Sequence, residues 1–178
     1  NSDGTIPTIN MTTEGAPQIE NLNPYTRVEA ETIAWSSGLK TEPKNEGGMN
    51  ICKIDNDDYI KVKGVDFGDT GAGVFTANVL SSSKGGIIEL RLDSPDGTLV
   101  GKLPVSSTGG WDNWVTKTTS ISGAKGVHDL YLVFKGEPTG ELFKLDYWKF
   151  NEKSDSHDLV AINAEIDKYE IDTTAGAS

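Results

Sequence analysis

Residues 85–105, GGIIELRLDSPDGTLVGKLPV, contain the pattern that decides the fold class. A short run from Ile87 to Leu92 alternates between inward-type and outward-type side chains after two glycines, which is typical of a β-strand with one buried face. Asp93-Ser-Pro-Asp-Gly97 follows and predicts a tight turn, because these residue types favour turn geometry. A second strand is expected from Thr98 to Val105.

The same pattern of short strands separated by turn residues continues in both directions from this stretch. Further strands are expected from Val28 to Thr32, and at 59–62, 74–80, 114–121, 127–134 and 142–150. Eight or more short strands without a long helical pattern predict an all-β fold, a β-sandwich of jelly-roll type.

Composition limits the partners that such a domain can have. The chain has 178 residues, 20 glycines, 7 prolines and a formal net charge of -11. This charge argues against nucleic acid and against an anionic membrane, and it suits an extracellular protein with an uncharged ligand. No run of eighteen apolar residues indicates a membrane span. Cys52 is the only cysteine, so no internal disulfide can form, and burial as a small apolar side chain is expected.

The two ends of the chain differ from its middle. Residues 1–23 are polar and interrupted by glycine and proline, as in a linker or the tail of a preceding domain. Residues 151–178 are interpreted as a linker or the start of a further module. The predicted domain is therefore 24–150.

Aromatic residues are the first candidates for a ligand surface. Trp111 directly follows Gly109 and Gly110, where a large indole is hard to bury, so we expect an exposed platform. Trp114 is expected in the core, and Trp35 is expected to pack. Tyr147 and Trp148 are adjacent on a strand and must face opposite sides, which places one of them in the core.

Acidic pairs suggest an ion site. Glu29 and Glu31 would leave one face of a strand, and a calcium ion between them would relieve their repulsion. Spacing alone favours the alternative of two solvated glutamates on an edge strand. The Asp55–Asp58 run lacks the glycine and the distant glutamate of a calcium loop, and a tight hairpin turn at Asn56 and Asp57 explains it better.

No recognisable motif indicates catalysis. The chain has no nucleophile elbow, zinc-protease motif or phosphate loop, and neither histidine lies in a known motif. Among 27 acidic residues some pair will have the separation of a glycosidase by chance. A non-catalytic binding domain is the favoured interpretation.

Taken in order, a series of motifs resembles a family 6 carbohydrate-binding module over about residues 24–150. The motifs are Arg27-Val-Glu-Ala-Glu-Thr-Ile-Ala34, Asp58-Tyr-Ile60, Val65-Asp-Phe-Gly68, Ile88-Glu-Leu-Arg-Leu-Asp93, Gly97-Thr-Leu-Val-Gly101, Gly109-Gly-Trp111, Gly126-Val-His-Asp-Leu-Tyr-Leu-Val-Phe134 and Leu145-Asp-Tyr-Trp148. With Asp3-Gly-Thr-Ile-Pro7 upstream, the match is similar to modules that follow family 43 arabinofuranosidases and xylosidases.

The resemblance implies a jelly roll that binds sugar through edge loops and carries a structural calcium ion. Its metal ligands fall on Glu29, Glu31 and Asp146, which favours the calcium interpretation of the glutamate pair.

The implied sugar site includes Trp111, but two of its usual residues are replaced. Lys53 occupies the place of a second aromatic, and Lys144 that of a sugar-binding asparagine. Both lysines can donate to sugar hydroxyls or to the glucuronate of decorated xylan. A second cleft used by some relatives would involve Tyr59, for which a purely structural role in the sheet is an equal alternative.

The function implied is a secreted, extracellular module, expected to be monomeric. It would bind xylan or xylo-oligosaccharide and target a covalently linked catalytic domain to the plant cell wall. The alternative is a structural module with weak or lost sugar affinity that packs against that catalytic domain.

Overall fold

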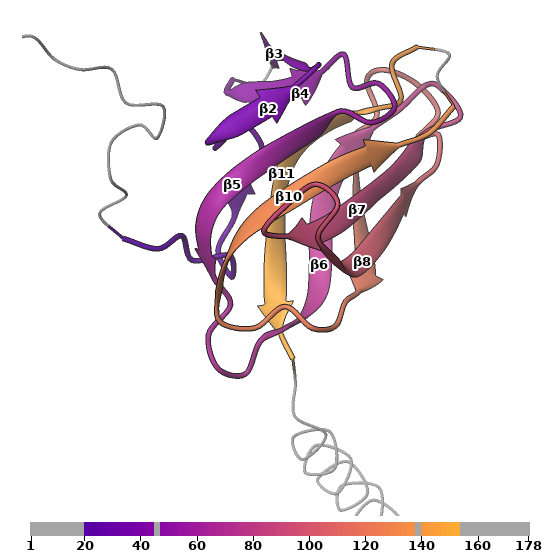
Figure 1. Cartoon of the computed structure of the whole chain (residues 1–178). Helices are drawn as coiled ribbons and strands as arrows, with labels where there is room; N and C mark the ends of the chain where they lie inside the picture. Colours follow the sequence, from indigo (N-terminus) through magenta and orange to yellow (C-terminus); the bar gives the residue numbers. More distant parts are fainter. Residues whose placement is uncertain (1–19, 45–46, 138–139, 154–178) are drawn as a thin grey trace, which may run out of the picture.

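A computed structural model of the protein describes residues 20–44, 47–137 and 140–153, and within them the chain is all-β. Figure 1 shows the strands wrapped into one sandwich. None of these residues forms a helix long and apolar enough to cross a membrane. The strands are β1 (Val28–Glu29), β2 (Trp35–Ser37), β3 (Lys40–Pro43), β4 (Met49–Cys52), β5 (Tyr59–Asp66), β6 (Ala72–Leu80), β7 (Gly86–Leu92), β8 (Thr98–Val105), β9 (Val115–Ser120), β10 (Val127–Lys135) and β11 (Lys144–Glu152).

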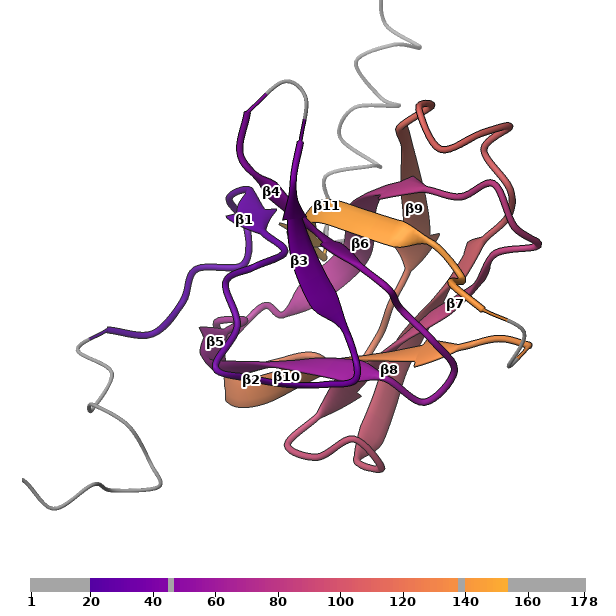
Figure 2. The ribbon, with the colours of Figure 1, turned by 90° about the horizontal axis from the view of Figure 1, so that it is seen from above.

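These strands form two antiparallel sheets that face each other. The first sheet has the order β3-β4-β11-β6-β9, and β1 also pairs with β11. The second has the order β2-β5-β10-β7-β8. Figure 2 shows the two layers from above. The predicted all-β sandwich is confirmed.

The turn within residues 85–105 is determined by residues that are close together in the sequence. A local pattern was therefore sufficient to predict it. β7 and β8 pair antiparallel, and the Gly97 amide donates to the Ser94 carbonyl at 2.9 Å to close the turn. A Cβ at Gly97 would lie 1.9 Å from the Leu92 carbonyl oxygen, so only glycine fits there.

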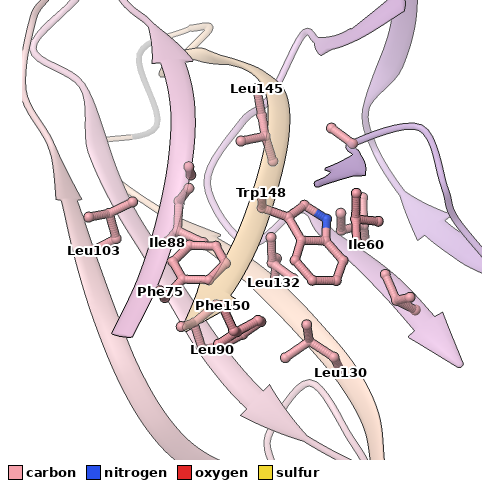
Figure 3. Packing of buried hydrophobic residues seen from close by; sticks show 14 of the residues in the cluster. Ile60, Phe75, Ile88, Leu90, Leu103, Leu130, Leu132, Leu145, Trp148 and Phe150 are labelled. Carbon is pink, nitrogen blue, oxygen red and sulfur yellow. The ribbon is translucent and has the colours of Figure 1, made fainter. Parts of the chain in front are cut away.

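The core lies between the sheets and is dominated by aromatic side chains. The Phe150 ring lies 5.0 Å from that of Phe75 and 5.7 Å from that of Trp148, the latter at an interplanar angle of 81°. Figure 3 shows these rings among the leucines and isoleucines of both sheets. Truncating a fully buried aromatic such as Trp148 to alanine costs about 3–5 kcal/mol in typical cores. Trp148 is thus the core member of the Tyr147–Trp148 pair, as alternation required.

Three local predictions are wrong. β1 ends at Glu29 and the chain turns, with the Thr32 amide donating to the Glu29 carbonyl, so Glu31 is not on the same strand as Glu29. Trp35 does not pack but is 66% exposed, because β2 is a fully exposed edge strand. The turn at Asn56 and Asp57 connects β4 of one sheet to β5 of the other, so it is not a hairpin.

Other predictions can be compared only in part. Cys52 is buried, as expected. β11 continues to Glu152, into the segment interpreted as a linker. The rest of the 151–178 segment, from 154 onward, and residues 1–19 lie outside the described residues.

Candidate functional site

Trp111 lies in the loop between β8 and β9 and is 43% exposed. Gly109, with a φ of +96°, adopts a left-handed conformation that few other residues tolerate. The loop is tied to the sandwich by the Thr108 amide, which donates to the Ser81 carbonyl at 2.7 Å. The indole therefore stands on an anchored loop with much of its surface open.

Beside this indole is a pocket of about 350 Å³, which we call the Trp111 pocket. Its volume is at the lower end of the range for ligand sites in proteins. Strands of the first sheet form one side, and the β8–β9 loop forms the other. The lining residues are Glu42, Pro43, Lys44, Asn50, Leu80, Trp111, Asp112, Trp114 and Lys144.

Lys144, at the start of β11, contacts both a ring and a carboxylate in this pocket. Its Nζ lies 5.3 Å from the centroid of the Trp111 ring and forms an ion pair with Glu42. The hydrogen bond from Lys144 lowers the pKa of Glu42 below its ordinary value. The structure therefore brings together Trp111 and Lys144, two of the residues that the sequence assigned to the sugar site.

Lys44 forms the second cationic contact of the pocket. Its Nζ lies 2.7 Å from Asp146 Oδ2 and 5.6 Å from the centroid of the Trp114 ring. The Lys44 side chain is 16% exposed and that of Asp146 is 5% exposed, so this ion pair is largely shielded from solvent. Trp114 lines the pocket rather than the core, which corrects its predicted position.

Lys53 lies apart from this pocket. Its backbone has a φ of +56°, and its amide donates to Glu141 Oε1 at 2.7 Å, while its Nζ lies 3.4 Å from Glu141 Oε2. It is not among the residues that line the Trp111 pocket. The two lysines that replace the family's tyrosine and asparagine are therefore not neighbours in one pocket.

Tyr59 belongs to a different surface, on the outer side of the second sheet. Strand register places Trp35 opposite Lys61, Lys61 opposite Tyr131, and Tyr59 opposite Val133. The Tyr59 and Tyr131 rings lie 5.8 Å apart, and Lys61 Nζ lies 5.6 Å from the Tyr131 ring. We call Trp35, Tyr59, Lys61 and Tyr131 the tyrosine face.

The three residues predicted to bind calcium lie where β1 and the turn after it meet β11. Two of them already form ion pairs with basic side chains. Arg27 holds Glu29 through two hydrogen bonds of 2.6 and 3.0 Å, and Lys44 holds Asp146. The Ala30 amide donates to the Asp146 carbonyl at 2.8 Å, which brings the Glu29–Glu31 turn against β11.

Two oxygens of this set are buried without a hydrogen-bond donor among the described residues. They are Glu31 Oε2 and Asp146 Oδ1. Buried carboxylate oxygens need a cation or a donor, and calcium prefers such oxygen ligands, so these residues fit the ion. Within 20–44, 47–137 and 140–153, however, no group of three or more acidic, histidine or cysteine side chains is already arranged around a common point.

Sequence reasoning missed several pocket residues. Glu42, Lys44 and Asn50 come from β3, β4 and the segment between them, and no local motif marks them. Trp114 carried a usable signal, since it lies three residues after Trp111 in the same Gly-Gly-Trp-Asp-Asn-Trp segment.

A β-sandwich that holds an exposed indole beside a pocket lined by both hydrogen-bond donors and acceptors is built like a carbohydrate-binding module. The model of the family "Carbohydrate binding module (family 6)" matches residues 29–152. The chain belongs to this family.

Three relatives place it within the family. An arabinoxylan arabinofuranohydrolase of Paenibacillus polymyxa is 46% identical over 168 residues, covering 92% of this chain and 26% of that enzyme. The crystal structure of a glycoside hydrolase family 43 arabinoxylan arabinofuranohydrolase from Bacillus subtilis, in complex with cellotetraose, has 49% identity and a TM-score of 0.78, covering 86% of this chain and 32% of that one. A family 6 module from Clostridium cellulolyticum in complex with xylose has 46% identity and a TM-score of 0.70, covering 74% of this chain and all of that one.

The chain is thus closely related to the modules of family 43 arabinoxylan arabinofuranohydrolases. It spans only about a quarter to a third of those enzymes' length and corresponds essentially to the binding module, which is not itself catalytic.

Proposed function

We propose that this module binds xylan or a related β-linked glycan through the Trp111 pocket and thereby holds a linked, secreted cell-wall hydrolase on its substrate. The observation that carries the proposal is the exposed Trp111 indole at the mouth of a pocket with polar walls. The flat C–H face of a pyranose can stack on such a ring. Relatives from arabinoxylan-active enzymes support the choice of glycan.

The charge of the pocket favours an uncharged glycan. Its lining contains two lysines and two acidic residues, so their formal charges balance. Lys144 is already paired with Glu42, and Lys44 with Asp146. A glucuronate would have to break one of these ion pairs, whereas neutral hydroxyls can bond to both members of a pair.

The binding energy sets the affinity that we expect. One exposed ring contributes roughly 1–3 kcal/mol, by analogy with stacking of bases on aromatic side chains. Hydrogen bonds from Lys144 and to Glu42 or Asp112 must add to this for millimolar binding, which requires about 4 kcal/mol. Weak binding is sufficient for a module that is covalently attached to its enzyme, because tethering raises the local concentration.

Calcium would have a structural role in this proposal. Glu29, Glu31 and Asp146 would hold it, and it would supply positive charge between the turn after β1 and the last strand. Since β1 also pairs with β11, the ion would reinforce an existing closure of the sandwich.

Retardation of the monomeric module in a native gel that contains soluble arabinoxylan tests the sugar site. Wild-type protein should be slowed, and Trp111→Ala should migrate as it does without the polysaccharide. Trp35→Ala is the matched control, because it removes another exposed indole from a different surface. Equal retardation of wild type and Trp111→Ala would exclude the Trp111 pocket.

A second candidate is a module that contributes structure to the linked enzyme and has little sugar affinity. It is favoured by Lys53, which stands where the resemblance places a second aromatic, and by the Lys144 ammonium 5.3 Å from the centroid of the Trp111 ring. Titration of xylo- and cello-oligosaccharides into the isolated module separates the two candidates. If no sugar produces heat or a chemical-shift change, the structural role is favoured.

A further inference from the structure

Lys44 belongs to two sites at once. It lines the Trp111 pocket, and its Nζ lies 2.7 Å from Asp146, one of the three residues proposed to hold calcium. The Trp114 ring, 5.6 Å from the Lys44 Nζ, also lines the pocket. No other residue is shared in this way between the lining of the pocket and the ion pairs of Asp146 within the described residues.

We infer that Lys44 is the resident counter-ion of Asp146 and that it exchanges with a divalent cation, so that occupancy of the ion site controls the position of an ammonium group in the glycan pocket. This inference rests on the proposed function for its effect on sugar binding. The exchange itself depends on the proposed calcium site at Glu29, Glu31 and Asp146 and on the Lys44–Asp146 ion pair, and not on sugar binding.

The electrostatics of the buried carboxylate support such an exchange. Asp146 is 4% exposed, and a carboxylate this deep must be neutralised. Lys44 contacts Oδ2 and Arg27 Nη2 lies 3.7 Å from the same oxygen, while Oδ1 has no donor among the described residues. A divalent ion on Oδ1 would lie within a few ångströms of the Lys44 ammonium, and the repulsion between like charges at that range weakens the ion pair.

The released side chain has a place to go. Asn50 is buried at 3% exposure, lines the same pocket, and its Oδ1 has no donor among the described residues. An ammonium that leaves Asp146 can bond to this oxygen or to a sugar hydroxyl between Trp111 and Trp114. Ion binding therefore adds a free hydrogen-bond donor to the pocket, and the glycan should bind more tightly in the presence of the ion.

Calcium titration calorimetry on chelator-treated protein tests the exchange. Lys44→Met removes the competing ammonium and should bind calcium at least roughly fivefold more tightly than wild type, because the ion pair that it removes is largely shielded from solvent. If the methionine variant folds poorly, Lys44→Gln can replace it. Lys44→Gln keeps a neutral donor and should behave similarly. Lys149→Met is the matched control, because it removes a lysine from β11, the strand that carries Asp146, at a position without an ion pair among the described residues.

Melting curves and tryptophan fluorescence give readouts that do not depend on sugar. In chelator, Lys44→Met should melt below wild type, and saturating calcium should close the gap. Calcium should also change the tryptophan emission of wild type, and Trp114→Phe should remove most of that change. Xylan retardation should increase with calcium in wild type but not in Lys44→Met.

The outcomes separate this inference from the sugar site. Equal calcium affinity of wild type and Lys44→Met overturns it, as does an absence of calcium binding in all variants. In either case retardation by xylan in chelator still reports on the Trp111 pocket by itself. Loss of retardation with an intact fivefold difference in calcium affinity rejects the sugar site and leaves the exchange standing.

Discussion

The Trp111 pocket and the tyrosine face both combine aromatic rings with a lysine, yet they expose their rings differently. Trp111 is 43% exposed on a loop, whereas Tyr131 is 8% exposed within β10 and packs against Tyr59. Lys61 is fixed by a 2.8 Å ion pair to Asp129 and lies over Tyr131. The difference teaches that neighbours within the sheet cover a ring such as Tyr131, whereas a ring on a loop, like Trp111, or on the exposed edge strand β2, like Trp35, remains open.

The largest expected effect is on glycan affinity, and it separates the two surfaces directly. Trp111→Ala should weaken binding of xylo-oligosaccharides about tenfold or more, because it removes a stacking contribution of roughly 1–3 kcal/mol. Tyr59→Ala should change the affinity less than about twofold. Calorimetry on both variants measures this. A larger loss from Tyr59→Ala would transfer the site to the tyrosine face.

The next effect is on stability. It should depend on the predicted calcium ligands and not on the tyrosine face. Chelator should lower the melting temperature by roughly 5 °C, as expected for the loss of about 1–2 kcal/mol in a domain of this size. Glu31→Ala should reproduce this shift, because it removes a ligand with a buried and otherwise unpaired oxygen. Tyr59→Ala serves as the control and should retain the full chelator shift. Melting curves of wild type that are identical with and without chelator would contradict the calcium assignment.

A smaller effect should sharpen the description of the pocket. Lys144→Asn removes the ammonium that lies over the Trp111 ring and should tighten sugar binding about threefold, since the ring face becomes free and an amide can still bond to a hydroxyl. Lys53→Asn, the matched change outside the pocket, should have no effect. If Lys144→Asn instead weakens binding as much as Trp111→Ala, an amide cannot replace the Lys144 ammonium as a donor to the sugar, and that hydrogen bond outweighs the gain from a free ring face.

The smallest effect concerns pH. The pKa of Glu42 is lowered from 4.5 by the hydrogen bond from Lys144, so this ion pair stabilises the fold above pH 4.5, and its contribution is lost as the pH falls through the lowered pKa of the folded state. Because both groups are partly exposed, we expect a few tenths of a kcal/mol.

Urea unfolding of wild type and Glu42→Gln measures this contribution. The difference in unfolding free energy should be constant near neutrality and should shrink below pH 4.5, with exposed Glu152→Gln as the control. A difference that grows on acidification would contradict the ion pair.

The sequence was sufficient for those features that depend on neighbours along the chain. The turn at Gly97 and the alternation in β7 are local, and so is the exposure of Trp111 after two glycines. Lys144 entered the site through the family resemblance, and the structure places it there.

The remaining features depend on contacts that no local pattern encodes. Lys44 and Asp146 are 102 residues apart in sequence, as are Glu42 and Lys144. The exposure of Trp35 follows from the position of β2 at the edge of its sheet, and the role of Trp114 follows from the path of β3 and β4 past the β8–β9 loop. Such pairings are set by topology, which the alternation of residues does not specify.

The pairing of β1 with β11 also determines how the module responds to mechanical tension. Because the two strands are antiparallel, with Val28 opposite Trp148, the chain before β1 and the chain after β11 leave from the same end of this ladder. The Phe150 amide, bonded to the Pro24 carbonyl at 2.8 Å, is the outermost bond at that end. A pull on both flanking segments would first meet the bonds that join Leu22 to Gly64 and Asp66 and would then open the ladder one hydrogen bond at a time, so β1 should peel away before the aromatic core opens.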